Sequence, residues 1–290
     1  MKARVAVLQF PGVNCEAETL RALGRVGLEA ELFRWTRPAA ELERFQAFVL
    51  PGGFSWQDRV RAGALAAKDP MVDVLADRAE RGSPVLGICN GAQVLAEAGL
   101  VPGDRADEAP GVGVALARNR MPGRAGYYAR WTYVRIEASP CLFTRDLAPG
   151  TVLPLPVAHA EGRFTARDPA TLADLVRTGQ APLRYATADG RLAAGFPDNP
   201  NGAEASVAAL CNPRGNVLAL MPHPERAQDL GAIARGVAGP WGGRRDQALG
   251  QPAAGSVGGA AEPLPLSDPD PAGPGLALFA GLARYLAEAG

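Results

Sequence analysis

The sequence predicts an α/β protein in which a mostly parallel sheet has helices on both faces and continues into a β-rich extension. The first observation behind this is the alternation of short apolar runs with longer amphipathic runs in the amino-terminal third. Strands that alternate with helices in this way form a parallel sheet covered on both faces. The second is a series of strand-like segments separated by turns in the middle of the chain. With 290 residues the chain can bury a sizeable core, and we expect one domain over residues 1–290.

The elements of the amino-terminal third follow from continuous apolar runs bounded by Gly, Pro and polar residues. Asn14 is the expected N-cap of the first helix, because its side chain can accept a backbone hydrogen bond there. The predicted strands are 4–10, 29–33, 47–50 and 84–88, and the predicted helical regions are 14–23, 56–67, 71–81 and 90–98.

The middle of the chain contains the strand-like segments that predict the extension, at 131–137, 152–157, 183–187, 205–210 and 217–220. Between Val237 and Gly275, 16 of 39 residues are Gly or Pro. Such a segment cannot bury enough apolar surface to offset its ordering entropy, so we expect a flexible insertion at about 237–275. A plain surface loop is favoured over a binding role. An amphipathic helix at 276–287 is expected to close the chain.

Charge and cysteine content restrict the partners. The 30 basic residues balance the 30 acidic ones, so no global field attracts nucleic acid or an anionic membrane. We therefore expect neither as a partner. The four cysteines form no CxxC pair, which argues against a zinc site. The amino terminus lacks the long apolar region of a signal peptide, and we expect a cytoplasmic protein with free thiols.

The segment Gly87-Ile88-Cys89-Asn90-Gly91 lies between a predicted strand and a predicted helix. This is the G-x-nucleophile-x-G elbow, with Cys in the nucleophile position. A sharp turn raises the nucleophile out of the sheet, and the helix N-terminus favours its thiolate. The backbone N–H of Asn90 then points to where an oxyanion forms. Without the rest of the site, a buried cysteine in a Gly-rich turn is the alternative. Cys15, which opens a helix after a turn, is the rival nucleophile.

A second Gly-bearing turn follows the third predicted strand. Gly52 and Gly53 permit close backbone approach to a substrate, and related hydrolases take the other oxyanion N–H from such a loop. Taken alone, this segment is better interpreted as an ordinary turn.

Only His159 and His223 can serve as the imidazole base that thiol acyl-transfer chemistry requires. His223 is flanked by prolines, which prevent a helix, so the segment is expected to be extended or turned. In an extended segment Glu225 faces the same side as His223. Glu225 would then orient the imidazole. His159 also has an acidic residue two positions on, Glu161. Spacing alone does not decide between the two histidines.

The ordered set of motifs resembles class I glutamine amidotransferases, and within them it is most similar to the glutaminase subunits of phosphoribosylformylglycinamidine synthase. The segments that carry the resemblance are Pro11-Gly-Val-Asn-Cys15, Pro51-Gly-Gly-Phe-Ser55, Gly63-Ala64, Cys89-Asn-Gly91, Val157-Ala-His159, Glu161-Gly162, Pro200-Asn-Gly202, Gly215-Asn-Val217 and Met221-Pro-His-Pro-Glu-Arg-Ala227. They run in order from about residue 3 to 230. Departures at Ala92, Ala203 and Trp56-Gln57 affect the expected shape of the glutamine pocket and the docking surface.

The resemblance implies a flavodoxin-like doubly wound fold, with Cys89 as nucleophile, His223 as base and Glu225 as orienter. It implies oxyanion and substrate binding by Gly52, Gly53 and Asn90, with His159 adjacent to the site and no metal. Ammonia cut from glutamine would pass to a separate large synthetase subunit, accompanied by a small accessory subunit. That partner would bind ATP and Mg and convert formylglycinamide ribonucleotide to the amidine in purine biosynthesis, while this chain carries no cofactor.

Three other functions are compatible with parts of the pattern. One is an amidotransferase that serves a different synthetase. Another is a regulatory module that retains the scaffold without catalysis. The third is a cysteine peptidase or stress-response protein of the same architecture, which the His-Pro-Glu segment and the motif order disfavour.

Overall fold

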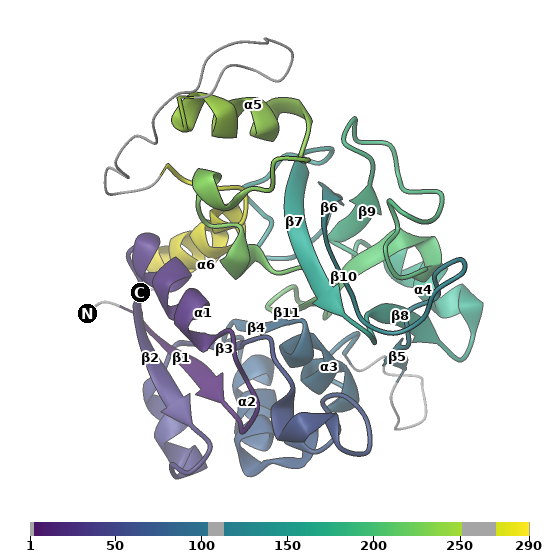
Figure 1. Cartoon of the computed structure of the whole chain (residues 1–290). Helices are drawn as coiled ribbons and strands as arrows, with labels where there is room; N and C mark the ends of the chain where they lie inside the picture. Colours follow the sequence, from purple (N-terminus) through teal and green to yellow (C-terminus); the bar gives the residue numbers. More distant parts are fainter. Residues whose placement is uncertain (1–2, 104–112, 251–270, 290) are drawn as a thin grey trace.

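The computed structural model describes residues 3–103, 113–250 and 271–289. Within them, a nine-stranded sheet of order β2-β1-β3-β4-β11-β10-β9-β6-β7 forms the centre of the molecule (Figure 1), and β5 and β8 form a separate antiparallel pair. The strands are β1 Arg4–Gln9, β2 Glu29–Arg34, β3 Ala47–Leu50, β4 Val85–Ile88, β5 Val114–Ala117, β6 Tyr128–Ile136, β7 Val152–His159, β8 Arg163–Ala166, β9 Leu183–Ala186, β10 Val207–Cys211 and β11 Val217–Leu220.

The sheet has a parallel part and an antiparallel part. Strands β2, β1, β3, β4 and β11 are parallel neighbours, whereas β10, β9, β6 and β7 continue the sheet through antiparallel pairings. The parallel part is the predicted doubly wound sheet, and the antiparallel part is the predicted β-rich extension. The α/β fold class is therefore confirmed.

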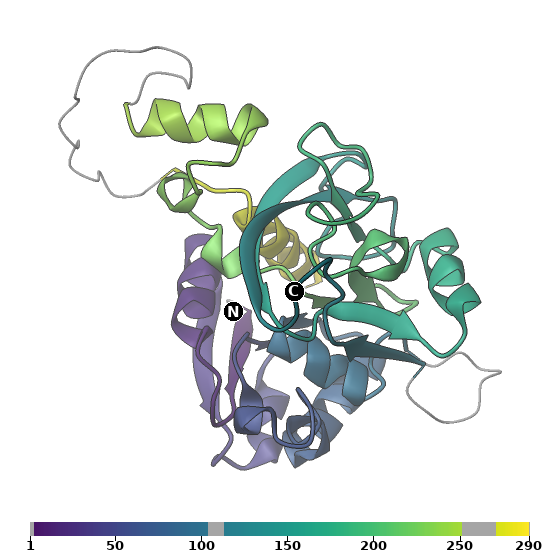
Figure 2. The same cartoon turned by 45° about the vertical axis from the view of Figure 1, so that its right-hand side comes forward.

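Helices cover both faces of the parallel part. The helices α1 and α6 lie side by side on one face, and α2 and α3 lie on the other (Figures 1 and 2). None of the helices within the described residues is both long enough and apolar enough to cross a bilayer. The helices are α1 Glu16–Arg25, α2 Pro70–Glu80, α3 Asn90–Glu97, α4 Pro169–Arg177, α5 Gly239–Ala248 and α6 Leu276–Ala289.

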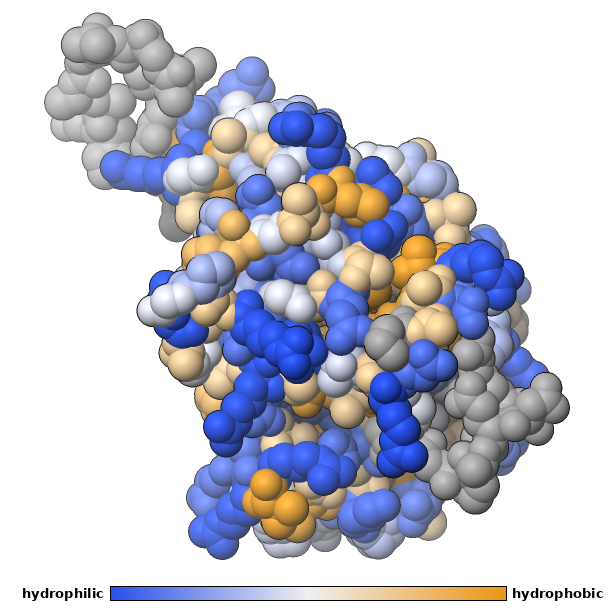
Figure 3. Space-filling model, turned by 90° about the vertical axis from the view of Figure 1, so that its right-hand side faces the viewer, coloured by the Kyte–Doolittle hydropathy of each residue, from blue (hydrophilic) through white to orange (hydrophobic). Residues whose placement is uncertain are grey.

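Burial on both faces explains the composition of the central strands. Every residue of β3 and β4 is buried, because helices cover both sides of a parallel sheet and leave no solvated face. On the side of the molecule shown in Figure 3, hydrophobic residues form small patches separated by hydrophilic ones. The continuous apolar runs of the sequence therefore belong to the core.

Local signals place some helix starts correctly. The Asp69 carboxylate accepts a hydrogen bond from the Met71 N–H at 3.0 Å, and Pro70 occupies the first turn of α2. Asp168 caps α4 in the same way, through the Ala170 N–H at 2.9 Å. These caps satisfy N–H groups that have no partner within the helix. Helix α4 was not predicted from the sequence, although this Asp-Pro signal precedes it, and neither were the short strands β5 and β8.

The predicted N-cap of the first helix is wrong. The helix α1 begins at Glu16, and Cys15 occupies the N-cap position without a side-chain cap hydrogen bond. The Asn14 N–H instead donates to the carbonyl of Gly52, as does the Cys15 N–H, both at 3.2 Å. The contact with the loop after β3 therefore decides where this helix starts.

The helix predicted over residues 56–67 is also wrong. That stretch contains only short 3₁₀ turns, Ser55–Asp58 and Ala66–Lys68, and Trp56, Gln57 and Asp58 all have positive φ values. The loop is held by tertiary contacts, since the Trp56 N–H donates to the Pro11 carbonyl at 2.6 Å. Such contacts override helix propensity.

The predicted insertion at about 237–275 divides into two parts. Residues Gly239–Ala248 form α5, so the prediction of a flexible segment is wrong there. The Arg245 guanidinium is buried, pairs with Asp246 at 2.7 Å and donates to the carbonyl of Ala234, which fixes this helix despite its glycines. Residues 251–270 of the predicted insertion lie outside the described residues. The expected closing helix is confirmed as α6.

Candidate active site

Cys89 occupies a strained turn between β4 and α3. Its φ of 51° and ψ of −102° lie in a region that costs non-glycine residues free energy, as in other nucleophile elbows. The flanking glycines are required by close packing. A Cβ atom on Gly91 would lie 2.0 Å from the Leu50 carbonyl oxygen, and one on Gly87 would lie 2.6 Å from the Gly91 carbonyl oxygen. The predicted elbow geometry is therefore present.

His223 and Glu225 form a buried pair directly after β11. The His223 Nδ1 lies 2.5 Å from the Glu225 Oε1, and both side chains are almost completely inaccessible to solvent. Of the two expected conformations, extended or turned, the structure has the turned one, because Pro224–Arg226 forms a 3₁₀ turn. The turn nevertheless brings the two side chains together, which is what the sequence analysis expected of them.

The sheet brings the elbow and the histidine to the same edge. Strands β4 and β11 are parallel neighbours, and the Cys89 N–H donates to the Leu220 carbonyl at 2.8 Å, shortly before His223. Strand β7 contacts both residues. Its Pro156 carbonyl accepts from the His223 N–H at 2.8 Å, and its Ala158 carbonyl lies 3.7 Å from the Cys89 Sγ.

The charge state of His223 reflects its neighbours. Burial lowers the pKa of His223, but the charges of Glu225 and Cys89 raise it, and the net effect places it well above the usual value near 6.5. The Nε2 atom is buried and has no hydrogen-bond partner among the described residues. An imidazolium with one free N–H can stabilise a thiolate when one forms on Cys89, and it can deliver a proton.

The glycine loop after β3 packs against the same imidazole. A Cβ atom on Gly52 would lie only 2.7 Å from the His223 Cε1, so any side chain at this position would displace the ring. Gly53 pairs with Val13 in an isolated bridge and lines the same pocket as Cys89. The loops that follow β1 and β3 thus meet beyond the carboxyl ends of the strands, where ligands of doubly wound sheets bind.

The side chain of Asn90 organises this edge of the pocket. Its Oδ1 accepts from the Ser55 N–H at 2.9 Å, and its Nδ2 donates to Asp58 at 3.2 Å and to Gln93 at 3.0 Å. The elbow is therefore tied through one buried amide to the loop that covers it.

The rival nucleophile Cys15 lies close to the imidazole of His223. Its Sγ, a ring nitrogen of His223 and a carboxylate oxygen of Glu225 lie within 4.8 Å of one another, which is close enough for all three to bind one metal ion. The Arg226 Nη2, however, donates to this sulfur at 3.1 Å, and a guanidinium cation disfavours a second cation there. Within the described residues, the pocket that contains Cys89 is not lined by Cys15.

The rival base His159 lacks the acidic partner that its sequence context suggested. Its Nδ1 lies 3.1 Å from the Oδ1 of Asn119, whereas Glu161 pairs with Arg118 at 3.6 Å. Burial and the charge of His223 lower the pKa of His159 to about 3. His159 is therefore a neutral imidazole in the wall of the pocket, next to the site as expected.

Acidification should destabilise the protein through His159. In the unfolded chain the His159 imidazole binds a proton near pH 6.5, whereas in the folded chain it does so only near pH 3. The free energy of unfolding should therefore fall on acidification below pH 6.5, by up to about 1.4 kcal/mol per pH unit from this group. Urea unfolding at pH 7, 6 and 5 should show a shallower pH slope for His159→Asn than for the wild type. Equal slopes would contradict this origin of acid sensitivity.

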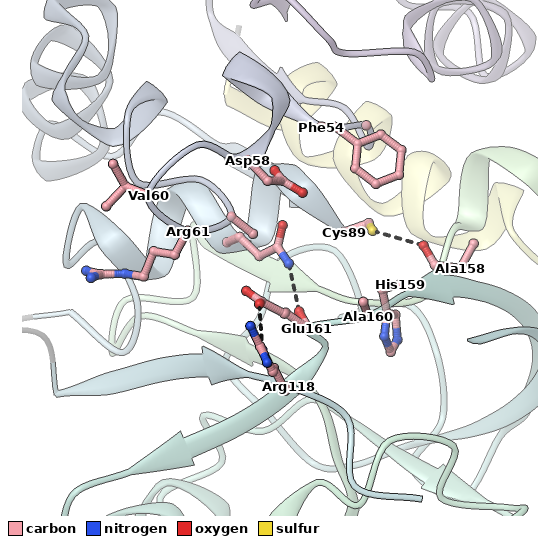
Figure 4. Close-up of a pocket in the computed structure, with 13 residues that line it drawn as sticks. Phe54, Asp58, Val60, Arg61, Cys89, Arg118, Ala158, His159, Ala160 and Glu161 are labelled. Atoms are coloured by element: carbon pink, nitrogen blue, oxygen red, sulfur yellow. Dashed lines mark hydrogen bonds and ion pairs between the residues drawn. The ribbon is translucent and has the colours of Figure 1, made fainter. Parts of the chain in front are cut away.

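The pocket beside Cys89 has a volume of about 340 Å³. Its walls include charged groups that the sequence analysis did not single out (Figure 4). The lining residues are Gly53, Phe54, Asp58, Val60, Arg61, Ala62, Cys89, Gln93, Arg118, Ala158, His159, Ala160 and Glu161. Asp58 and Arg61 belong to a loop that was predicted to be a helix, which explains why the sequence did not reveal them as pocket residues.

Comparisons with known proteins place most of the chain beside glutamine amidotransferases. A family model described as a CobB/CobQ-like glutamine amidotransferase domain matches residues 2–242. A phosphoribosylformylglycinamidine synthase subunit PurQ from Methanothrix thermoacetophila is 46% identical over 232 residues, which cover 77% of this chain and 86% of the relative. The subunit PurQ of Thermomicrobium roseum is 45% identical over 228 residues, which cover 78% and 88%. A chain in the structure of PurLQS from Thermotoga maritima superposes with a TM-score of 0.63 at 30% identity, covering 85% of this chain and 97% of that one.

Proposed function

This chain belongs to the CobB/CobQ-like glutamine amidotransferase family, and from that premise we propose that Cys89, His223 and Glu225 form a Cys-His-Glu triad that releases ammonia from glutamine. The chain acts as the glutaminase subunit of phosphoribosylformylglycinamidine synthase in purine biosynthesis, as the PurQ relatives support. The single observation that carries the triad is the buried His223–Glu225 pair at 2.5 Å, placed one strand away from the elbow that holds Cys89.

The chemistry follows from this arrangement. The Cys89 thiolate attacks the side-chain carbonyl carbon of glutamine, and backbone N–H groups of Asn90 and of the Gly52-Gly53 loop stabilise the oxyanion. The His223 imidazolium protonates the departing nitrogen, and ammonia leaves a thioester on Cys89. His223 then takes a proton from water, which attacks the thioester and releases glutamate. Glu225 holds the imidazole in the required orientation throughout.

Ammonia must reach a second catalytic centre before it is protonated in water. We infer that a large synthetase subunit covers the mouth of the pocket and receives the ammonia. The exposed rings of Phe54 and Tyr127 lie together beside the pocket, with their centroids 6.4 Å apart. Val60, which lines the pocket, is also exposed. Exposed apolar side chains that gather beside an active site are typical of a surface that a partner covers. ATP and Mg, and a small accessory subunit, are expected to belong to that assembly.

The compartment is expected to be the cytoplasm. All four cysteines are free thiols, as a reducing environment maintains them.

The proposed function is tested by purifying this chain with the proteins that bind it and measuring ammonia release from glutamine, with and without them. We expect the partner to stimulate release and the complex to form formylglycinamidine ribonucleotide from formylglycinamide ribonucleotide, glutamine and ATP. Activity with a different acceptor would favour an amidotransferase that serves another synthetase. A complex that forms but never releases ammonia would favour a regulatory module.

A further inference from the structure

The pocket beside Cys89 contains a carboxyl group that the triad chemistry does not use. Asp58 lies on the pocket wall close to Cys89 (Figure 4). Its side chain accepts one hydrogen bond, from the Asn90 Nδ2 at 3.2 Å, and in the described part of the chain it forms no ion pair with Lys or Arg. The arginines that line the pocket already have partners, since Arg61 bonds to Glu97 at 2.5 Å and Arg118 lies 3.6 Å from Glu161.

The electrostatics of this wall favour a bound cation. Burial and, to a smaller extent, the charge of the neighbouring Glu161 carboxylate raise the pKa of Asp58 to about 6. Two carboxylates that share a pocket repel each other unless a positive charge lies between them. An ammonium group placed there would restore the ordinary ionisation of Asp58.

The histidine in the pocket wall does not offset the charge of this carboxyl group. His159 lines the same pocket, and its buried Nε2 has no hydrogen-bond partner among the described residues. The Asn119 Oδ1 accepts from the Gly162 N–H at 3.1 Å and faces the His159 Nδ1, so Nδ1 carries the proton and Nε2 is an acceptor. His159 is therefore neutral and supplies no positive charge to the pocket.

Glutamine supplies such a cation at a suitable position. When its side-chain amide carbon lies against the Cys89 sulfur, its α-ammonium group lies at the far end of a short carbon chain inside the pocket. We propose that Asp58 is a specificity-determining residue that binds the α-ammonium group of glutamine, with Glu161 adding negative charge. This inference rests on the proposed function. It explains how the enzyme distinguishes a free amino acid from other primary amides.

The test compares ligands that differ only in this amino group. Glutamate and glutarate are measured as competitive inhibitors of glutamine hydrolysis by the complete complex, for the wild type and for Asp58→Asn. An asparagine at this position can still accept the hydrogen bond from Asn90, so the substitution removes charge while the loop contact is kept. A charged hydrogen bond is worth about 1.5–3 kcal/mol. Asp58→Asn should therefore raise the inhibition constant of glutamate by roughly 10- to 100-fold and leave that of glutarate unchanged. The KM for glutamine should rise by a similar factor.

Asp174→Asn is the matched control, since this exposed carboxylate lies on α4 outside the pocket and should shift neither inhibitor. If Asp58→Asn weakened inhibition by glutamate and by glutarate equally, the role of Asp58 would be structural. If it weakened inhibition by neither, Asp58 would have no role in substrate binding. Both results would overturn the inference while the wild-type complex still releases ammonia. A wild-type complex that releases none would instead overturn the proposed function.

Discussion

Replacing Cys89 by alanine should reduce glutamine-dependent amidine synthesis by roughly 10⁴- to 10⁶-fold, the loss expected when a covalent nucleophile is removed. The same complex should keep its activity with added ammonium, because the second reaction takes place in the partner. The buried elbow should tolerate the substitution, since alanine keeps the Cβ atom and removes only the sulfur. Synthesis rates with glutamine and with ammonium chloride are the two measurements.

Cys15→Ala is the matched control for this experiment. Both cysteines lie near His223, but within the described residues the pocket is lined by Cys89 and not by Cys15. Cys15→Ala should therefore retain covalent labelling by an electrophilic glutamine analogue, and Cys89→Ala should lose it. Labelling of Cys15 in the Cys89 variant at the wild-type rate would reverse the assignment. Loss of the ammonium-dependent activity in a folded Cys89 variant would contradict the assignment of glutamine hydrolysis to this chain and of amidine synthesis to its partner.

The sequence predicted those parts of the site that depend on short-range geometry. The elbow at Cys89 is a local structure, in which close contacts at Gly87 and Gly91 force the glycines that the motif contains. The pair of His223 and Glu225 was also predicted, in a segment that was expected to be extended or turned. Both features can be predicted from the sequence because a few adjacent residues determine them.

The rest of the site depends on contacts between distant segments. The loop that carries Asp58 was predicted to be helical, yet the Trp56 N–H bonds to the Pro11 carbonyl and the loop adopts positive φ values. Periodicity does not reveal such a contact. For the same reason, spacing alone could not choose between His159 and His223, whose difference lies in the partners Asn119 and Glu225 that the fold supplies.

Replacing Glu225 by glutamine should lower glutamine hydrolysis by roughly 10³- to 10⁴-fold, as for the loss of the orienting acid in other triads. The two side chains have nearly the same shape, so the buried site should remain packed. The charge of Glu225 offsets much of the effect of burial on His223. Without it, burial should lower the pKa of His223, and fewer imidazolium cations would be present at neutral pH to hold the Cys89 thiolate.

This cause can be separated from a loss of packing by alkylation with iodoacetamide across pH. In Glu225→Gln, the reaction of Cys89 should be slow at neutral pH and should accelerate as the solution becomes alkaline, whereas the wild type should react readily at neutral pH. Glu18→Gln is the matched control, because Glu18 lies 3.9 Å from Arg226 but outside the buried pair. It should retain the wild-type profile. If Glu225→Gln lost hydrolysis but kept the wild-type alkylation profile, its carboxylate would not act through the charge of His223, and only the orienting role assigned to it would remain.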